Sequence, residues 1–167
     1  MRTGLLLVLC ALLSFCKGDD HEKCLNDRMS ILLKDLINTS KDIEKKLPSD
    51  IEAFNRMIHI SKKCYRKATV SDFKQILDLY KESVFNQLLK IKPLLLPDRF
   101  LTFFHRLLDD LDLCESKSKT KCMEKNLKHL QEKFKKLTLE KQIKALSEFR
   151  GVLIKFPLIL ARKRARN

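Results

Sequence analysis

Apolar residues recur three and four positions apart through residues 122–156, and this pattern constrains the fold more than any other feature. The first set is Met123, Leu127, Leu130, Phe134 and Leu137, and the second is Ile143, Leu146, Phe149, Val152 or Leu153, and Phe156. Such spacing places each set on one face of an α-helix. Thr138, between the sets, is expected to cap the second helix, with Glu140 in its first turn. Because one amphipathic helix cannot bury its own apolar face, the segment predicts two helices of a larger bundle.

Two helical segments are expected before residue 60. The first, Leu25–Leu47, carries the apolar positions Met29, Leu32, Leu33, Leu36, Ile43 and Leu47, and Pro48 ends it. Residues 49–52 spell a Ser-Asp-Ile-Glu capping box, which predicts a short helix with Ile51, Phe54, Met57 and Ile58. Residues 61–67 then form a basic connector that holds Cys64.

Two further helices are expected between residues 69 and 111. A second capping signal at residues 69–72 opens a helix with the stripe Phe73, Ile76, Leu77, Tyr80, Val84, Leu88 and Ile91. Pro97 and Asp98 start the next helix, whose apolar positions are Phe100, Leu101, Phe103, Phe104, Leu107, Leu108 and Leu111. Phenylalanines at consecutive positions predict two buried faces and a central place for this helix. Six helices, no strand pattern and only three glycines indicate an all-α bundle.

The first eighteen residues are typical of a secretory signal peptide. Arg2 supplies the positive start, Leu5–Phe15 is the apolar core, and small residues before Asp19 suit cleavage. This apolar run is too short to span a bilayer, and no second run of spanning length follows. We therefore expect a secreted, extracellular protein with a helical domain at 19–156, an N-terminal membrane anchor being the alternative.

Secretion determines how the cysteines are interpreted. Cys10 and Cys16 leave with the signal peptide, and the mature chain keeps Cys24, Cys64, Cys114 and Cys122. Four cysteines in an oxidising compartment indicate two disulfides, for which three connectivities exist, and the spacing does not choose among them. A zinc site is not favoured because the chain lacks Cys-x-x-Cys and His-x₃-His pairs.

Residues that would carry catalytic chemistry are not grouped in the sequence. The histidines at 21, 59, 105 and 129 have no paired spacing, and there is no glycine-rich phosphate loop or nucleophile elbow. Asp109, Asp110 and Asp112 form the one carboxylate cluster, and adjacent helical residues point apart, which indicates a solvated helix face. We expect no enzyme activity, cofactor or metal.

The positive charge is large and clustered. The formal net charge is +14, and losing Arg2 and Lys17 with the signal lowers it to +12. Basic clusters lie at 62–67, at 117–136 and in the tail 157–167, where the cations are Arg162, Lys163, Arg164 and Arg166. Pro157 is expected to end the last helix and separate this tail from the bundle. The scattered lysines suit solvated helix faces, whereas the tail favours contact with heparan sulfate, anionic lipid or DNA. No aromatic residue is interleaved with it, so stacking on bases is not supported.

Three segments resemble the interleukin-10 cytokine family. Lys133–Leu137 followed by Ile143–Phe149 is similar to its last two helices, and Glu82–Leu88 is most similar to the interleukin-26 branch. The resemblance covers residues 24–156 and departs at Arg150, where the family has Asp, at Pro157 and in the spacing of the last two cysteines. It implies a six-helix class II cytokine bundle with two disulfides, Cys24–Cys114 and Cys64–Cys122.

The resemblance also implies a function in immune and inflammatory signalling. Such a protein binds a class II cytokine receptor heterodimer, whose JAK kinases then activate STAT factors. The first helix, the connector and the last helix would form the receptor face, at the exposed positions Lys34, Asp35, Lys41, Asp42, Lys144, Ser147 and Arg150. Asn38 begins an Asn-Thr-Ser glycosylation acceptor. The alternatives are a cationic host-defence protein that binds microbial membranes or DNA, and an interferon-gamma-like cytokine. Both monomer and intertwined homodimer stay open.

Overall fold

The protein is mostly helical in the part described by this computed structural model. The backbone is described for residues 27–53, 56–114 and 120–164, and side chains for 28–51, 56–114 and 120–159. The elements are α3 (Asp27–Glu44), η1 (Ser49–Ala53), α4 (Lys62–Tyr65), α5 (Val70–Tyr80), η2 (Lys81–Phe85), α6 (Asn86–Ile91), η3 (Pro93–Leu95), α7 (Asp98–Asp112), α8 (Lys121–Phe134) and α9 (Leu139–Arg164). No strand occurs within these ranges, which confirms the all-α class.

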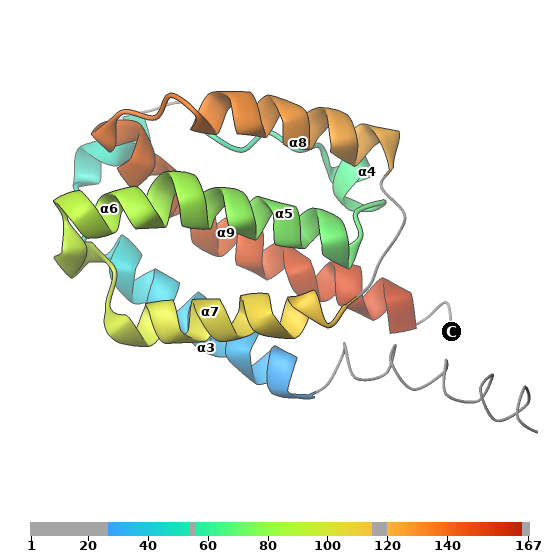
Figure 1. Cartoon of the computed structure of the whole chain (residues 1–167). Coiled ribbons are helices and arrows are strands. Elements are labelled where there is room, and N and C mark those ends of the chain that lie inside the picture. Colours follow the sequence, from blue (N-terminus) through green and yellow to red (C-terminus); the bar gives the residue numbers. More distant parts are fainter. Residues whose placement is uncertain (1–26, 54–55, 115–119, 165–167) are drawn as a thin grey trace, which may run out of the picture.

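The helices pack as a bundle around α9. Figure 1 shows α5 and α6 as one continuous rod, with α8 and α7 on either side of it and α9 passing behind. α3 packs against both α7 and α9, and α9 also contacts α5, α6 and η2. The last helix in the chain is therefore the central element of the described fold, the place that the sequence had indicated for α7.

Helix starts follow the expected capping chemistry. At α5, Thr69 accepts from the Asp72 amide while Asp72 accepts from the Thr69 amide at 2.8 Å, which completes a capping box. Thr138 Oγ1 accepts from the Lys141 amide at 3.4 Å and so caps α9, as expected. Pro97 precedes α7, the start predicted from the Pro-Asp pair.

The core is aromatic and centres on Phe149 of α9. Its ring lies 4.8 Å from Tyr80 and 5.0 Å from Phe85, measured between ring centroids, and 5.8 Å from both Phe100 and Phe104. These side chains are essentially buried. Edge-to-face arrangements of this kind add to the free energy gained by burying the rings themselves. The cluster joins α9 to α7 and to the rod formed by α5, η2 and α6.

A π-helical turn, η2, changes the register of the rod between α5 and α6. The Asn86 N–H donates to the Lys81 carbonyl, five residues back, so this turn holds one residue more than an α-helical turn. Val84 and Phe85 are both buried as a result, whereas Ile91 is 54% exposed. The predicted stripe is confirmed up to Leu88 and wrong at Ile91, the last residue of α6.

The short helix expected around Ile51–Ile58 is wrong in extent. A 3₁₀-helix, η1, covers only Ser49–Ala53, and Phe54 lies outside the described residues. Met57 and Ile58 are buried in an irregular segment, and their amides donate to the Glu148 carboxylate of α9. A short helix, α4, instead begins in the basic connector, where Ser61 accepts from the Cys64 amide at 3.2 Å.

Helix α7 has one buried face, so the prediction of two is wrong. Phe100 and Phe104 are fully buried, whereas Leu101 and Phe103 are half-buried. The Phe103 ring lies at the surface under the Arg99 guanidinium, 5.3 Å from the ring centroid. A cation over a half-exposed ring supplies a contact that the apolar pattern alone does not reveal.

Helix α9 continues through Pro157 to Arg164, which corrects the expected end of the helix. Proline keeps a backbone φ compatible with a helix and removes one hydrogen bond. Pro157 lies on the exposed side, while Phe156 and Ile159 beside it are buried. Packing of these neighbours therefore holds the helix together across the missing bond.

Candidate functional site

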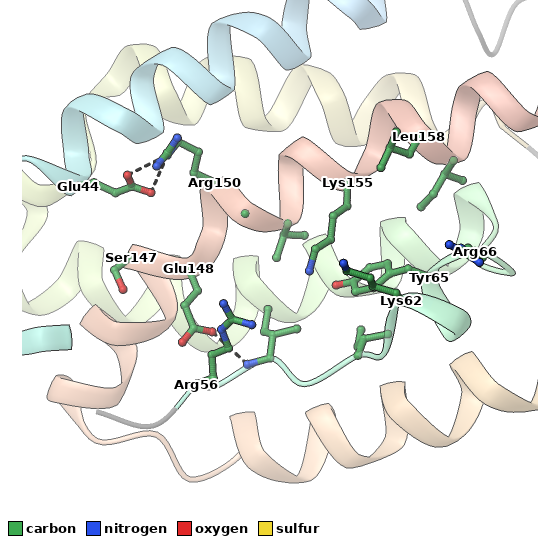
Figure 2. A pocket seen from close by; sticks show the side chains of 15 residues that line it. Glu44, Arg56, Lys62, Tyr65, Arg66, Ser147, Glu148, Arg150, Lys155 and Leu158 are labelled. Carbon is green, nitrogen blue, oxygen red and sulfur yellow. Dashed lines mark hydrogen bonds and ion pairs between the residues drawn. The ribbon is translucent and has the colours of Figure 1, made fainter. Parts of the chain in front are cut away.

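A groove of about 670 Å³ lies along the outer side of α9, opposite the aromatic core. Its walls come from α9, from residues 56–66 and from the C-terminal end of α3 (Figure 2). The lining residues are Glu44, Arg56, Ile58, Ile60, Lys62, Tyr65, Arg66, Ser147, Glu148, Arg150, Gly151, Val152, Lys155, Leu158 and Ile159. Three segments distant in sequence thus share one concave surface.

Glu148 fixes the irregular segment after η1 to α9. Its carboxylate accepts from the Met57 amide at 3.0 Å and from the Ile58 amide at 3.1 Å. Hydrogen bonds from amides to a carboxylate are stronger than those between neutral groups. From the other side, Lys133 of α8 donates to the Met57 carbonyl at 3.4 Å. The irregular part of this wall, before α4, is therefore ordered by side chains of two helices.

A disulfide fixes the next part of the same wall. Cys64 of α4 is bonded to Cys122 of α8, with 5.7 Å between their Cα atoms, and Cys64 is fully buried. Asn126 donates to the Cys122 carbonyl at 2.8 Å and lies against the bridge. This is one of the two pairs that the family resemblance implied. Cys24 lies outside the described residues, so the Cys24–Cys114 pair stays a prediction.

The charged groups of the groove are unequally partnered. Glu44 accepts from Arg150 Nε at 2.8 Å, and the Glu148 carboxylate is used by the two amides. Among the described residues, the lining cations Arg56, Lys62, Arg66 and Lys155 make no ion pair. The groove therefore presents positive charge that the fold itself does not neutralise.

Lys155 and Tyr65 meet across the groove. Lys155 Nζ lies 4.3 Å from the centroid of the Tyr65 ring, a cation–π contact between α9 and α4. Burial lowers the pKa of the Lys155 ammonium, the Arg56 charge lowers it further, and Glu148 opposes both. Burial also raises the pKa of Tyr65 to about 12, so its hydroxyl stays protonated at neutral pH.

The seven receptor positions proposed from the sequence divide by helix. On α3, Lys34, Lys41 and Asp42 are exposed and Asp35 is half-buried. On α9, Ser147 and Arg150 line the groove, and Lys144 lies just outside it, 4.0 Å from Glu148. The structure thus brings two of the seven into the groove.

The α9 candidates are less exposed than expected. The Lys144 side chain is only 12% exposed, and Ser147 Oγ donates to the Lys144 carbonyl at 2.7 Å. Arg150 is half-buried because it binds Glu44 across the α3–α9 interface. These side chains already make contacts within the fold, and their role in receptor binding stays a prediction.

The main groove residues were missed from sequence. Glu148, Gly151, Lys155 and Leu158 lie three or four residues apart, so they follow one line on α9 beside the apolar stripe. That spacing could have identified this wall. Nothing in the sequence indicated that Tyr65 would face Lys155, since their contact depends on tertiary packing.

Other predicted sites lie at the surface or outside the described residues. Asn38 is exposed on α3, which leaves room for a glycan. The backbone is helical at Arg162, Lys163 and Arg164, whose side chains are not described, and Arg166 lies outside the described residues with the predicted signal peptide. The acidic cluster of α7 forms ion pairs: Asp110 with Arg28 at 3.6 Å and Asp112 with Lys74 at 3.0 Å.

Within the described ranges, no group of three or more His, Cys, Asp or Glu residues is arranged to hold a metal ion. None of the helices in those ranges is both long and apolar enough to cross a membrane. The chain matches no family model, no curated protein and no solved structure. The geometry of the groove is therefore the main guide to function.

Proposed function

We propose that this chain is a secreted helical cytokine that acts by binding, with the α3–connector–α9 groove as its receptor face. The partner is a two-chain class II cytokine receptor, and the outcome is JAK–STAT signalling. Support comes from the resemblance of the last two helices to the interleukin-10 family and from the all-α bundle around them. The positions chosen by resemblance also fall on the two helices that border the groove.

The observation that carries the proposal is the attachment to α9, by Glu148, of the segment that leads into the connector. The bonds to Met57 and Ile58 attach the segment after η1 to α9, in addition to the bond from Lys133 of α8. With them, a wall carrying Arg56 and Tyr65 stands opposite Lys155. A rigid surface with unneutralised cations suits recognition of a protein partner, because charge complementarity raises both association rate and specificity.

Receptor capture and STAT phosphorylation test the proposal together. The secreted protein is used to capture receptor chains from responsive cells, and phosphorylated STAT is measured in the same cells. The double variant Lys62→Glu/Arg66→Glu reverses two exposed groove charges and is expected to reduce both signals at least tenfold. The matched control Lys90→Glu/Lys92→Glu changes the net charge equally at exposed positions of the α6 end. Equal loss in both variants, or in neither, would refute the groove as receptor face.

A second candidate function, polyanion binding through the C-terminal basic cluster, is favoured by the continuation of α9 beyond Pro157. Helical backbone to Arg164 places three cations within a single turn, which concentrates positive charge. Removal of residues 162–167 is expected to lower both heparin affinity and its dependence on salt, since fewer counterions are released. This function is measured by elution from heparin at graded salt and by killing of bacteria in an assay that contains no receptor-bearing cells. Unchanged elution after truncation would exclude it.

A further inference from the structure

The hydroxyl of Tyr65 is a buried polar group without a protein partner. Tyr65 is only 9% exposed, and its oxygen makes no hydrogen bond to any described residue. A buried hydroxyl left without a hydrogen bond destabilises a fold, so such groups are rare unless something else binds them. Figure 2 shows the hydroxyl on the side of the ring that faces Lys155 and the interior of the groove.

The surroundings of this hydroxyl are rich in donors. Lys155 Nζ lies 4.3 Å from the ring centroid, and Arg56 is close enough for its charge to act on Lys155. Two cations facing one another repel, and a group placed between them that accepts hydrogen bonds would be favoured by both. Glu148 does not fill this role completely, because both of its oxygens accept from the Met57 and Ile58 amides. The arrangement therefore suits an external anion.

The rest of the groove indicates what carries that anion. Ile58, Val152 and Ile159 give it an apolar floor, and Leu158 beside them is 58% exposed. Gly151 has no side chain, and the space beside its Cα is open, because a Cβ there would meet no atom within 4 Å. A sulfated glycan has no apolar groups to match this floor, whereas a polypeptide carrying an acidic and an aliphatic or aromatic side chain matches both.

We propose that Tyr65, Lys155 and Arg56 form a subsite for the carboxylate of an aspartate or glutamate on a partner protein, whose adjoining apolar side chain packs on Leu158. The inference rests on the proposed function, in which this face binds a receptor, and adds the chemistry that the receptor must present. Tyr65 donates its hydroxyl hydrogen to the carboxylate, and the two cations neutralise it. Binding satisfies a group that the isolated chain leaves unsatisfied.

The two tyrosines of the chain allow a direct test on the intact mature protein. With ¹³Cζ-labelled tyrosine, Tyr65 and Tyr80 give two NMR signals, which Tyr65→Phe assigns. Hexaglutamate is titrated as the carboxylate probe, hexaglutamine as its neutral control and a heparin hexasaccharide as the sulfate probe, all at one ionic strength. We expect hexaglutamate alone to move the Tyr65 signal in a saturable way. Lys155→Gln should weaken that response at least tenfold, whereas Lys90→Gln, at an exposed site on α6, should not change it.

The outcomes separate this inference from the proposed function. If the Tyr65 signal moves and STAT phosphorylation never occurs with any variant, the subsite stands and the cytokine function fails. If signalling is normal in Tyr65→Phe and Lys155→Gln and the Tyr65 signal does not move, the cytokine function stands and the subsite is overturned. A response to the heparin fragment in place of hexaglutamate also overturns it, because the anion would then be a sulfate.

Discussion

The two tyrosines of the chain lie in regions that use a phenol hydroxyl in opposite ways. Tyr80, in the aromatic core, is fully buried and donates to the Ala145 carbonyl at 3.0 Å. Tyr65, in the groove wall, is buried with no hydrogen-bond partner for its hydroxyl in the described part of the chain. Burial raises the pKa of Tyr65 to about 12 and that of Tyr80 well above its usual value. The core tyrosine completes its hydrogen bond within the chain, and the groove tyrosine does not.

This difference separates stability from binding along a single helix. The inner side of α9 carries Phe149, which contacts aromatic rings of three other segments. The outer side carries Glu148 and Lys155, which order the groove and charge it. We therefore expect substitutions on the inner side to lower the free energy of unfolding, and those on the outer side to change partner binding more than stability. Five predictions test this division, in order of decreasing effect.

Phe149→Ala should have the largest effect on folding. Truncating a fully buried phenylalanine removes its transfer free energy and leaves a cavity, at a cost of about 3–5 kcal/mol. Urea unfolding of purified protein measures this loss, and secretion yield should fall with it. The control Phe103→Ala, at a half-buried site on α7, should cost much less. Equal losses at the two sites would show that Phe149 has no special place in the core.

Removing the Cys64–Cys122 disulfide should weaken the groove wall more than the core. The bond spans 58 residues, and cross-links of this kind stabilise by about 2–4 kcal/mol. In Cys64→Ser/Cys122→Ser, unfolding should require less urea, and amide exchange at Met57 and Ile58 should accelerate before exchange at core positions such as Phe104. Uniform acceleration across both regions would contradict a separate groove wall.

Glu148→Gln should loosen the segment around Met57 and Ile58 from α9 while leaving the aromatic core intact. The amide side chain offers one acceptor where the carboxylate offers two, and the charge that strengthens both bonds is lost. We expect a stability loss of about 1–2 kcal/mol, with faster amide exchange at Met57 and Ile58 and weaker receptor capture. Wild-type receptor capture by this variant would show that the wall does not need its attachment to α9.

Replacing each of the two tyrosines by phenylalanine gives a matched comparison of the core and the groove. Tyr80→Phe removes a made hydrogen bond and should cost about 1–1.5 kcal/mol, measured by urea unfolding. Tyr65→Phe removes a hydroxyl with no described partner and should leave stability within about 0.5 kcal/mol of the wild type or raise it. A loss at Tyr65 as large as that at Tyr80 would mean that the groove hydroxyl is already bound within the folded chain.

Arg150→Glu should have the smallest effect on stability. Arg150 and Glu44 are 37% and 25% exposed, so solvent screens their attraction, and the pair contributes about 0.5 kcal/mol. Charge reversal places two carboxylates together, and Glu44→Arg in the same chain should restore the loss. STAT activation is measured beside urea unfolding. Full signalling by Arg150→Glu would remove this residue from the receptor face.

Much of the fold could be predicted because it follows from local patterns. The stripes of α8 and α9, the caps at Thr69 and Thr138 and the start of α7 at Pro97 depend on residues close in sequence. The errors arose where tertiary contacts override local preference. The Glu148 carboxylate holds Met57 out of a helix, and buried neighbours carry α9 past Pro157.

The candidate site was predicted only in outline. The connector and the last helix, chosen from the sequence as receptor face, both line the groove, and their role in receptor binding stays a prediction. Tyr65 and Lys155 were not predicted as site residues, since their contact joins positions 90 apart in the chain. Arg150 was expected to be exposed. Its partner Glu44 lies 106 residues away on α3, so the sequence around Arg150 does not reveal the ion pair that half-buries it.

Because η2 is a π turn, the burial of the side chains that follow it depends on the number of residues between Tyr80 and Leu88 as well as on their identity. Loss of one residue within η2 before Phe85 would restore a regular α-helix and shift Phe85 and all of α6 by about 100° around the helix axis, carrying Phe85 out of the aromatic cluster. Natural variants should therefore tolerate substitution at the exposed Glu82 while keeping this spacing constant. In distant relatives whose residues have diverged, the preserved length of this turn would serve as an alignment marker for the fold.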